Sequence, residues 1–421
     1  MAKGGKIDIM KFSVNRNSLF YLKIQNHINW FAFFVAFPVV ILFGINFSFL
    51  YFILIFFLLV GKYPILKIKD NVLILPLLFA IGAVISVIDL NSKNPNALDR
   101  SLQVLPNYIY WTLLVIILVN LRQMLNIVIF SKYITLGIVL TFIFYIIQDN
   151  FSAFKFILNP LSPNSLSFII ICFAAPCFVY LNTVKKNKIF SYGFLILSVF
   201  FLILEGRRAG TVLVFFPCLL SLLFSKIKIQ NLILGFIVFI LGFALLQQES
   251  VKNTMEQLNP RIYELVYESE NITTGDQSYL VRRLQVEKAI IIFLDNPITG
   301  IGLNNFGNYS VEFQGNFEGS ELVIRKEKTN ETSAHNSYIM LLAEGGLLLL
   351  IPFILLLIYN IIKFINFYNY RSKLENAFYW SYLAMNIHFY FIAEIVNVHA
   401  WFTISITTLL SVKYSKIKNI G

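Results

Sequence analysis

The chain has 421 residues, of which 57% are hydrophobic and 13% are charged, and its mean hydropathy is +0.72. Soluble globular proteins carry about 25% charged residues, so this composition excludes a water-soluble globular protein. The net charge of +12 would suit a nucleic-acid partner, but the placement of the basic residues along the chain points to another cause.

Apolar runs of about 20 residues can cross a hydrocarbon core of about 30 Å. Twelve runs come near that length, so the sequence predicts an all-α integral membrane protein with about 12 transmembrane helices. Four runs are short, and one of them, 46–61, could instead form a hairpin with its neighbour. The first 27 residues lack the apolar core and cleavage site of a removable signal peptide, so none is expected. The runs are 28–45, 46–61, 72–90, 104–120, 126–147, 165–182, 189–204, 209–225, 229–247, 337–361, 377–396 and 399–413.

Basic residues concentrate on one side of the predicted topology. With the N-terminus in the cytoplasm, twelve crossings also place the even-numbered connections and the C-terminus inside. These segments hold most of the 34 lysines and arginines but only three acidic residues, Asp8, Asp70 and Glu375. This is the positive-inside bias of membrane proteins. The basic charge therefore sets the topology, and no nucleic-acid partner is expected.

One connection, residues 248–334, is long, and the topology places it outside the membrane. It carries 13 acidic and 8 basic residues, and long loops cross the membrane largely regardless of charge. Within it, Ser278–Leu294 has apolar residues at helical spacing and ends before Pro297. The sequence therefore predicts three parts: nine spans in 1–247, a mostly helical cap in 248–334, and three spans in 335–421.

Two pairs of arginines lie at the outer boundary of the predicted membrane. Arg207 and Arg208 stand in a connection of a few residues, EGRRAGT, so both must lie at or just within the outer leaflet. Arginine at that depth is costly unless it snorkels to the interface or faces a polar cavity. Interfacial anchoring is one interpretation, and an anion site is the other, because guanidinium binds phosphate in a bidentate fork. Arg282 and Arg283 open the loop helix about 100° apart, so a solvated face explains at least one of them.

His335-Asn336 ends the polar loop at the same predicted depth as the arginines. An imidazole with an unperturbed pKa near 6.5 can accept a proton at neutral pH, although a hydrogen-bonded structural histidine is the simpler interpretation. His399, in a short outer connection, could line the same cavity. Glu344 follows His335 by nine residues inside the next span, where an acidic side chain requires a polar partner.

Several catalytic motifs are missing from the sequence. We find no Walker loop, no HExxH, no GxSxG, and no paired aspartates that would hold a divalent metal beside a nucleotide. The three cysteines fall inside apolar runs and lack metal-site spacing. We therefore expect no metal and no cofactor, and neither ATP coupling nor a nucleotide-sugar donor used in the cytoplasm.

Three motifs in order resemble the bacterial O-antigen ligase and polymerase superfamily. His335-Asn336, nine residues and then Gly346 match the family's histidine motif, whereas Leu349 stands where the family has a further small residue. The stretch EGRRAG is similar to the family's arginine motif, with Arg208 as the closer counterpart. The stretch RRLQVEKAIIIFLDNPITGIGLNNF resembles the loop segment in which an arginine opens a helix and P-x-x-G-x-G closes it, with Arg283 as the counterpart.

The resemblance implies a metal-independent, inverting glycosyltransferase of the GT-C-like class in the bacterial inner membrane, with its site facing the periplasm. Its donor would be an oligosaccharide on undecaprenyl pyrophosphate, and its acceptor a lipid-linked repeat in a polymerase or lipid A-core in a ligase. Leu349 and the 43 phenylalanines and 21 tyrosines favour the polymerase slightly. His335 would be catalytic, Arg207, Arg208 and Arg283 would bind pyrophosphate, and Asn336, Arg282, Glu344 and His399 would support them.

Two other classes of protein remain as alternatives. A polysaccharide transporter or flippase has a similar number of spans but usually shows inverted repeats, broken helices and charges near the midplane. This chain instead keeps its unusual charges at one face. The second alternative is a purely structural scaffold. It would not explain why Arg207, Arg208 and His335 are all predicted at the same membrane depth.

Overall fold

The computed structural model describes part of the chain, and all regular structure in that part is helical, without a strand. This confirms the predicted all-α class. The described residues are 18–37, 47–60, 70–93, 95–147, 163–204, 208–223, 249, 277–309, 334–391 and 397–418.

The helices follow the predicted apolar runs in chain order, and run 229–247 lies outside the described residues. The predicted loop helix is also present, as α14 (Gln277–Asp295). The remaining helices are α1 (Ser18–Ala36), α2 (Phe47–Val60), α3 (Ile74–Lys93) after the 3₁₀ turn Asn71–Leu73, α4 (Pro95–Asn120), α5 (Ile127–Ile147), α7 (Pro163–Val179) with the π turn Tyr180–Val184, α8 (Lys188–Leu204), α9 (Arg208–Leu223), α16 (Ser337–Phe367), α17 (Lys373–His388) and α18 (Val398–Lys418).

Several of these helices have the length and composition of membrane spans. Among the described residues, five are long and apolar enough to cross a bilayer: Asn71–Asp89, Ala97–Asn120, Ile127–Ile147, Ser165–Val184 and Ser337–Tyr370. Large aliphatic side chains are exposed on their outer faces, for example Leu78, Ile81 and Ile85 on α3. Exposed aliphatic rows are favourable against hydrocarbon and unfavourable in water. The molecule is thus built as a multi-pass membrane protein.

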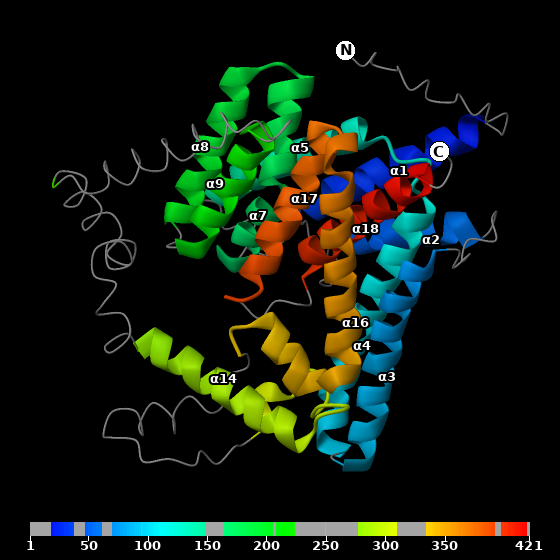
Figure 1. Ribbon diagram of the computed structural model, residues 1–421, viewed down its shortest axis with the longest axis vertical. Helices are drawn as coiled ribbons and strands as arrows, with labels where there is room; N and C mark the ends of the chain where they lie inside the picture. Colours follow the sequence, from blue (N-terminus) through cyan, green and yellow to red (C-terminus); the bar gives the residue numbers. More distant parts are fainter. Residues whose placement is uncertain are drawn as a thin grey trace.

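The helices divide into a bundle and a longer layer beside it (Figure 1). The bundle contains α7, α8, α9 and α17, whereas α3, α4 and α16 pack side by side and extend to the end of the molecule where α14 lies. Helix α14 packs on α16. Helix α4 begins nine residues before run 104–120, and Ser101 in this added part donates to the carbonyl of Leu303 (2.7 Å), eight residues after the end of α14.

Helix α18 lies at the centre of the molecule, and every residue from His399 to Val412 is buried. Most of its hydroxyl groups donate to carbonyls within the helix: Thr403, for example, donates to the carbonyl of His399, four residues earlier (2.8 Å). Two polar contacts of Asn360 join α18 to α16: the amide of Asn360 donates to Thr408 Oγ1 (2.9 Å), and the hydroxyl of Ser411 donates to Asn360 Oδ1 (2.9 Å). Polar side chains in an apolar interior need such partners, so these contacts specify how the two helices pack.

Candidate functional site

His335 and Asn336 form the turn that opens α16. His335 is half-buried and has a φ of +50°, a left-handed conformation that few residues other than glycine adopt. Asn336 is the N-cap: its side-chain oxygen accepts the backbone N–H groups of Tyr338 (3.0 Å) and Ile339 (3.2 Å). Asparagine is among the best N-cap residues, because it satisfies donors that the helix itself cannot. The Asn336 N-cap therefore fixes the backbone next to His335, which carries the imidazole.

The end of α17 holds this turn from the other side. The backbone N–H of Ser337 donates to the carbonyl of Phe389 (2.8 Å), and the hydroxyl of Tyr338 donates to the carbonyl of Asn386 (2.9 Å). His388, a span residue in the sequence-based prediction, is buried beside Phe389 with its ring 5.0 Å from the ring of Phe168. The sequence placed His388 in the interior of the predicted span 377–396, and the available signal was a histidine inside an apolar run. The start of α16 therefore cannot move independently of α17.

Helix α16 is broken at Gly346, and the outer segment 297–302 fills the break. Gly346 has φ +60° and ψ −157°, outside the helical region. A break of this kind frees two carbonyls and two N–H groups, and here all four find partners in the outer segment. The four bonds are Ile301 N to Ala343 O (3.1 Å), Gly302 N to Glu344 O (3.0 Å), Leu347 N to Pro297 O (2.9 Å) and Leu348 N to Ile298 O (3.2 Å).

Glu344 stands immediately before this break and is buried. Its Oε1 accepts the backbone N–H of Phe306 (3.1 Å), so the partner of this carboxyl lies a few residues beyond the outer segment. Ser86 of α3 donates to the carbonyls of both Thr299 (2.7 Å) and Glu344 (3.2 Å). The P-x-x-G-x-G segment, α3 and the first half of α16 are thus one hydrogen-bonded unit that orients the helix carrying His335.

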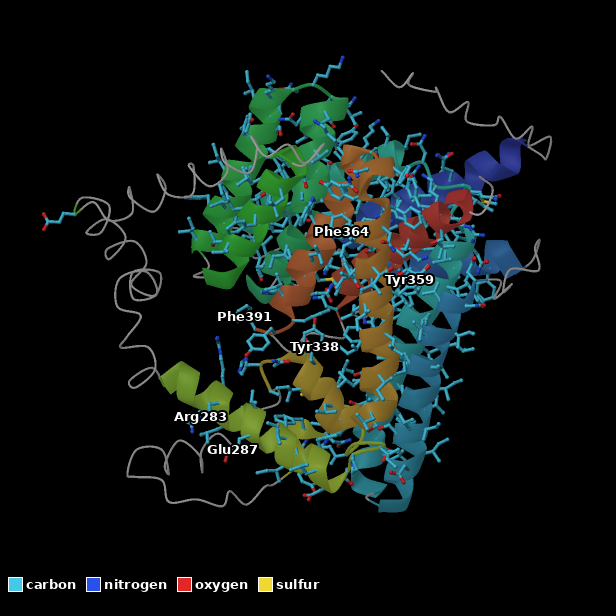
Figure 2. All side chains as sticks on the ribbon, viewed as in Figure 1. Arg283, Glu287, Tyr338, Tyr359, Phe364 and Phe391 are labelled. Carbon is cyan, nitrogen blue, oxygen red and sulfur yellow. The ribbon has the colours of Figure 1, made fainter. Side chains whose placement is uncertain are left out.

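Helix α14 leaves Arg282 and Arg283 exposed and buries a lysine; Figure 2 shows Arg283 on this helix. Lys288 is fully buried, and its Nζ lies 4.7 Å from the centre of the Phe306 ring. Burial lowers the pKa of Lys288 to about 8. Its spacing of four from Leu284 and Ile292 put it on the buried face, but sequence reasoning did not single it out.

The remaining predicted site residues are Arg207, Arg208 and His399, and the structure describes the side chain only of His399. Arg207 and the side chain of Arg208 lie outside the described residues, although the backbone of α9 begins at Arg208. Helix α9 packs along α17 and begins at the end of the bundle where α17 ends (Figure 1). His399 is buried at the start of α18, with its Nδ1 2.8 Å from Asn397 Oδ1 and its ring 6.2 Å from that of Phe173. It therefore faces α7 from the interior.

Residues 193–354 match the family model described as O-antigen ligase. The match confirms the resemblance to the O-antigen ligase and polymerase superfamily. It spans less than half of the 421 residues. No curated protein matches the chain.

The matched region, residues 193–354, contains all three motif positions: the start of α9, the segment from α14 to Phe306, and the first half of α16. Helix α17, which holds the His335 turn, lies outside the matched region. Within the described residues, no three His, Cys, Asp or Glu side chains gather as a metal site requires. Together with the apolar helices, the match indicates a membrane enzyme of the ligase and polymerase type, whose substrates are lipid-linked sugars.

Proposed function

We propose that the protein is a metal-independent, inverting glycosyltransferase of the GT-C-like class in the bacterial inner membrane. Its donor is an oligosaccharide on undecaprenyl pyrophosphate, and its acceptor is a sugar hydroxyl at the periplasmic face. The proposal includes twelve spans with both termini in the cytoplasm, and a periplasmic cap in 248–334. The observation that carries it is the half-buried His335, held in a left-handed turn by the Asn336 cap and by Phe389.

The proposed reaction is one displacement at the anomeric carbon. The acceptor oxygen bonds to that carbon as the bond to the phosphate oxygen breaks, and the hydroxyl proton passes to His335. Arg207, Arg208 and Arg283 neutralise the departing pyrophosphate, because guanidinium groups stabilise charge that develops on a phosphate. The supporting residues are Asn336, Arg282, Glu344 and His399.

Polymerase and ligase differ only in the acceptor, and we favour the polymerase. The family position that is usually small is Leu349, which is buried against Gly345: a Cβ at Gly345 would lie 2.0 Å from a Leu349 methyl group. A larger residue fits here because a glycine precedes it by one turn. This departure and the abundance of aromatic residues support a lipid-linked repeat as the acceptor over lipid A-core.

The test is a complementation experiment with His335→Asn in a strain that lacks the gene. Asparagine tolerates a positive φ, so this variant removes the imidazole without the backbone strain that alanine would add. Asn336→Ser, which keeps a capping side chain, is the matched control at equal expression. Lipopolysaccharide from each strain is separated on a gel.

We expect His335→Asn to lose long chains and Asn336→Ser to keep them. A single repeat on the core would identify a polymerase. Bare core, with polymerised glycan on its lipid carrier, would identify a ligase. A full ladder from His335→Asn would exclude a proton-accepting role for this residue and remove the main support for the proposal.

A further inference from the structure

A row of large aliphatic side chains is exposed on the last turns of α14 and just beyond. Leu294 is 68% exposed and Ile298 is 63% exposed, and Ile290 is exposed one turn earlier. Ile290 and Leu294 are four residues apart and lie on one side of the helix, opposite the buried Ile292, and Ile298 follows in the turn after the helix ends at Asp295. A helix that stands in water carries polar residues on its outer side. The side of these turns that carries Ile290 and Leu294 is instead apolar, and the exposed Asp295 lies about 100° away from Leu294 around the helix.

This row continues the exposed apolar surface of α16. Leu347, Ile351 and Leu355 are exposed at a spacing of four along α16, within the candidate span Ser337–Tyr370. Ile298 lies directly beside the start of that stripe, because its carbonyl accepts the N–H of Leu348 (3.2 Å). The exposed apolar row of α14 and Ile298 therefore adjoins the exposed apolar row of the candidate span at Leu347.

Helix α3 borders the same place with another exposed stripe. Ile85 and Ile88 are exposed, Ile88 by 65%, at the end of the candidate span Asn71–Asp89. Ser86, between them, donates to the carbonyl of Thr299 (2.7 Å), and the hydroxyl of Thr299 donates to Asp89 (2.5 Å). The segment after α14 is therefore fastened to α3 at the level of its last exposed aliphatic residues.

The outer side of α14 changes character along its length. Arg282 and Arg283 are exposed in its first half, and Arg283 shares the outer side with Leu294, three turns later. In Figure 1 the C-terminal end of α14 lies toward the layer that contains α16, on which α14 packs, whereas its N-terminal end reaches away from that layer. Figure 2 shows Arg283 and Glu287 on the half that reaches away. Charged residues toward water and aliphatic residues toward the spans are the pattern of a helix at a membrane surface.

We propose that the last turn of α14 and Ile298 are inserted in the outer leaflet, with Leu294 and Ile298 among phospholipid acyl chains. The first half of α14, with Arg282 and Arg283, stands in water at or above the headgroups. The partner of this face is thus the lipid surface itself, and the cap of the protein is anchored in the bilayer through α14 as well as through its flanking spans.

The test measures the surroundings of single nitroxide labels on the full-length protein. Leu294→Cys and Ile298→Cys are labelled in a background in which the buried Cys172, Cys177 and Cys218 are replaced by alanine. The protein is reconstituted in phosphatidylethanolamine and phosphatidylglycerol vesicles. Power saturation then compares collisions with oxygen, which concentrates in lipid, and with a water-soluble nickel chelate. Arg283→Cys is the matched water-facing control, and Ile351→Cys is the lipid-facing control.

We expect the ratio of oxygen to nickel collisions at Leu294 and Ile298 to approach that of Ile351 and to exceed that of Arg283 several-fold. A nickel-dominated ratio, equal to that of Arg283, would overturn the proposal. Immobile labels that neither reagent reaches would also overturn it, because another protein surface would then cover the row. Spin–spin broadening in that case would identify a second copy of the chain, and its absence another segment of the same chain.

Discussion

At the scale of single residues, the His335-Asn336 turn assigns two tasks to two neighbouring residues: His335 supplies the imidazole, and Asn336 caps the helix that positions it. Asn336 accepts two backbone N–H groups at the start of α16. We predict that Asn336→Ala destabilises the protein by about 1 kcal/mol, because the cap is lost, whereas Asn336→Ser stays near wild type. Thermal unfolding in detergent measures the difference, expected at about 1–2 °C. Equal midpoints for alanine and serine would show that the cap contributes nothing to stability.

Lys288 leads to a prediction about pH. Its pKa is lowered from 10.5 to about 8 by burial. Between these two values the unfolded chain binds more protons than the folded protein, so stability must rise with pH across this window. Below pH 8 the cost of a buried cation is present in full. We predict that raising the pH from 7 to 10 stabilises wild type relative to Lys288→Met by at most about 3 kcal/mol.

The methionine variant keeps the length of the side chain and removes the titrating group, so other ionisable groups cancel in the comparison. Thermal midpoints of both proteins across the pH range supply the measurement. Parallel curves would mean that Lys288 keeps an ordinary pKa in the folded protein, and that its burial against Phe306 has no electrostatic cost.

At the scale of elements, the break in α16 depends on Gly346. A Cβ at this position would lie 2.3 Å from the carbonyl oxygen of Ile298, and the φ of +60° is itself unfavourable for alanine. We predict that Gly346→Ala destabilises the protein by at least about 3 kcal/mol, combining backbone strain with weakened hydrogen bonds to the outer segment. The yield of monodisperse protein and its thermal midpoint test this.

Gly193 in α8 is the matched control, because no atom lies within 4 Å of a Cβ added there. Alanine inside a helix is favoured over glycine by about 0.5–1 kcal/mol, so Gly193→Ala should be neutral or stabilising. If both substitutions had the same effect, the hydrogen bonds between the break in α16 and the segment 297–302 would not explain the need for glycine at position 346.

The elements themselves were predictable, because hydropathy and helical spacing are local properties. The loop helix expected at 278–294 spans 277–295, and each of the other described α-helices overlaps an apolar run, with bounds that differ by up to about ten residues. The backbone hydrogen bonds between 297–302 and 343–348 were not predictable, because the two segments are distant in the sequence. The burial of Lys288 was not predicted either: its spacing from Leu284 and Ile292 was a signal, but a lysine in a polar loop ordinarily faces water. The motif residues could be predicted from the sequence, but the hydrogen bonds that hold them in place could not.

At the scale of the whole molecule, the end opposite α14 is fastened by charged groups. Glu375 is bonded to Lys413 (2.9 Å) and to the hydroxyl of Tyr414 (2.7 Å), which joins the start of α17 to the end of α18. Arg122 pairs with Asp70 (3.1 Å) between α4 and the turn before α3. These contacts use the few acidic residues of the basic connections. The two ends therefore differ in chemistry, as the positive-inside bias requires of opposite membrane faces.

This asymmetry predicts which end faces the cytoplasm, and surface labelling can test it. Lys185 follows α7 at the basic end, and Asn308 lies in the 3₁₀ turn Phe306–Asn308 after α14; both are exposed. We predict that a membrane-impermeant maleimide labels Asn308→Cys in intact spheroplasts but labels Lys185→Cys only after permeabilisation. The native Cys172, Cys177 and Cys218 are buried, so unmodified protein should give little background. The reverse pattern would place the His335 turn in the cytoplasm, where the proposed lipid-linked donor and acceptor of the outer leaflet could not reach it.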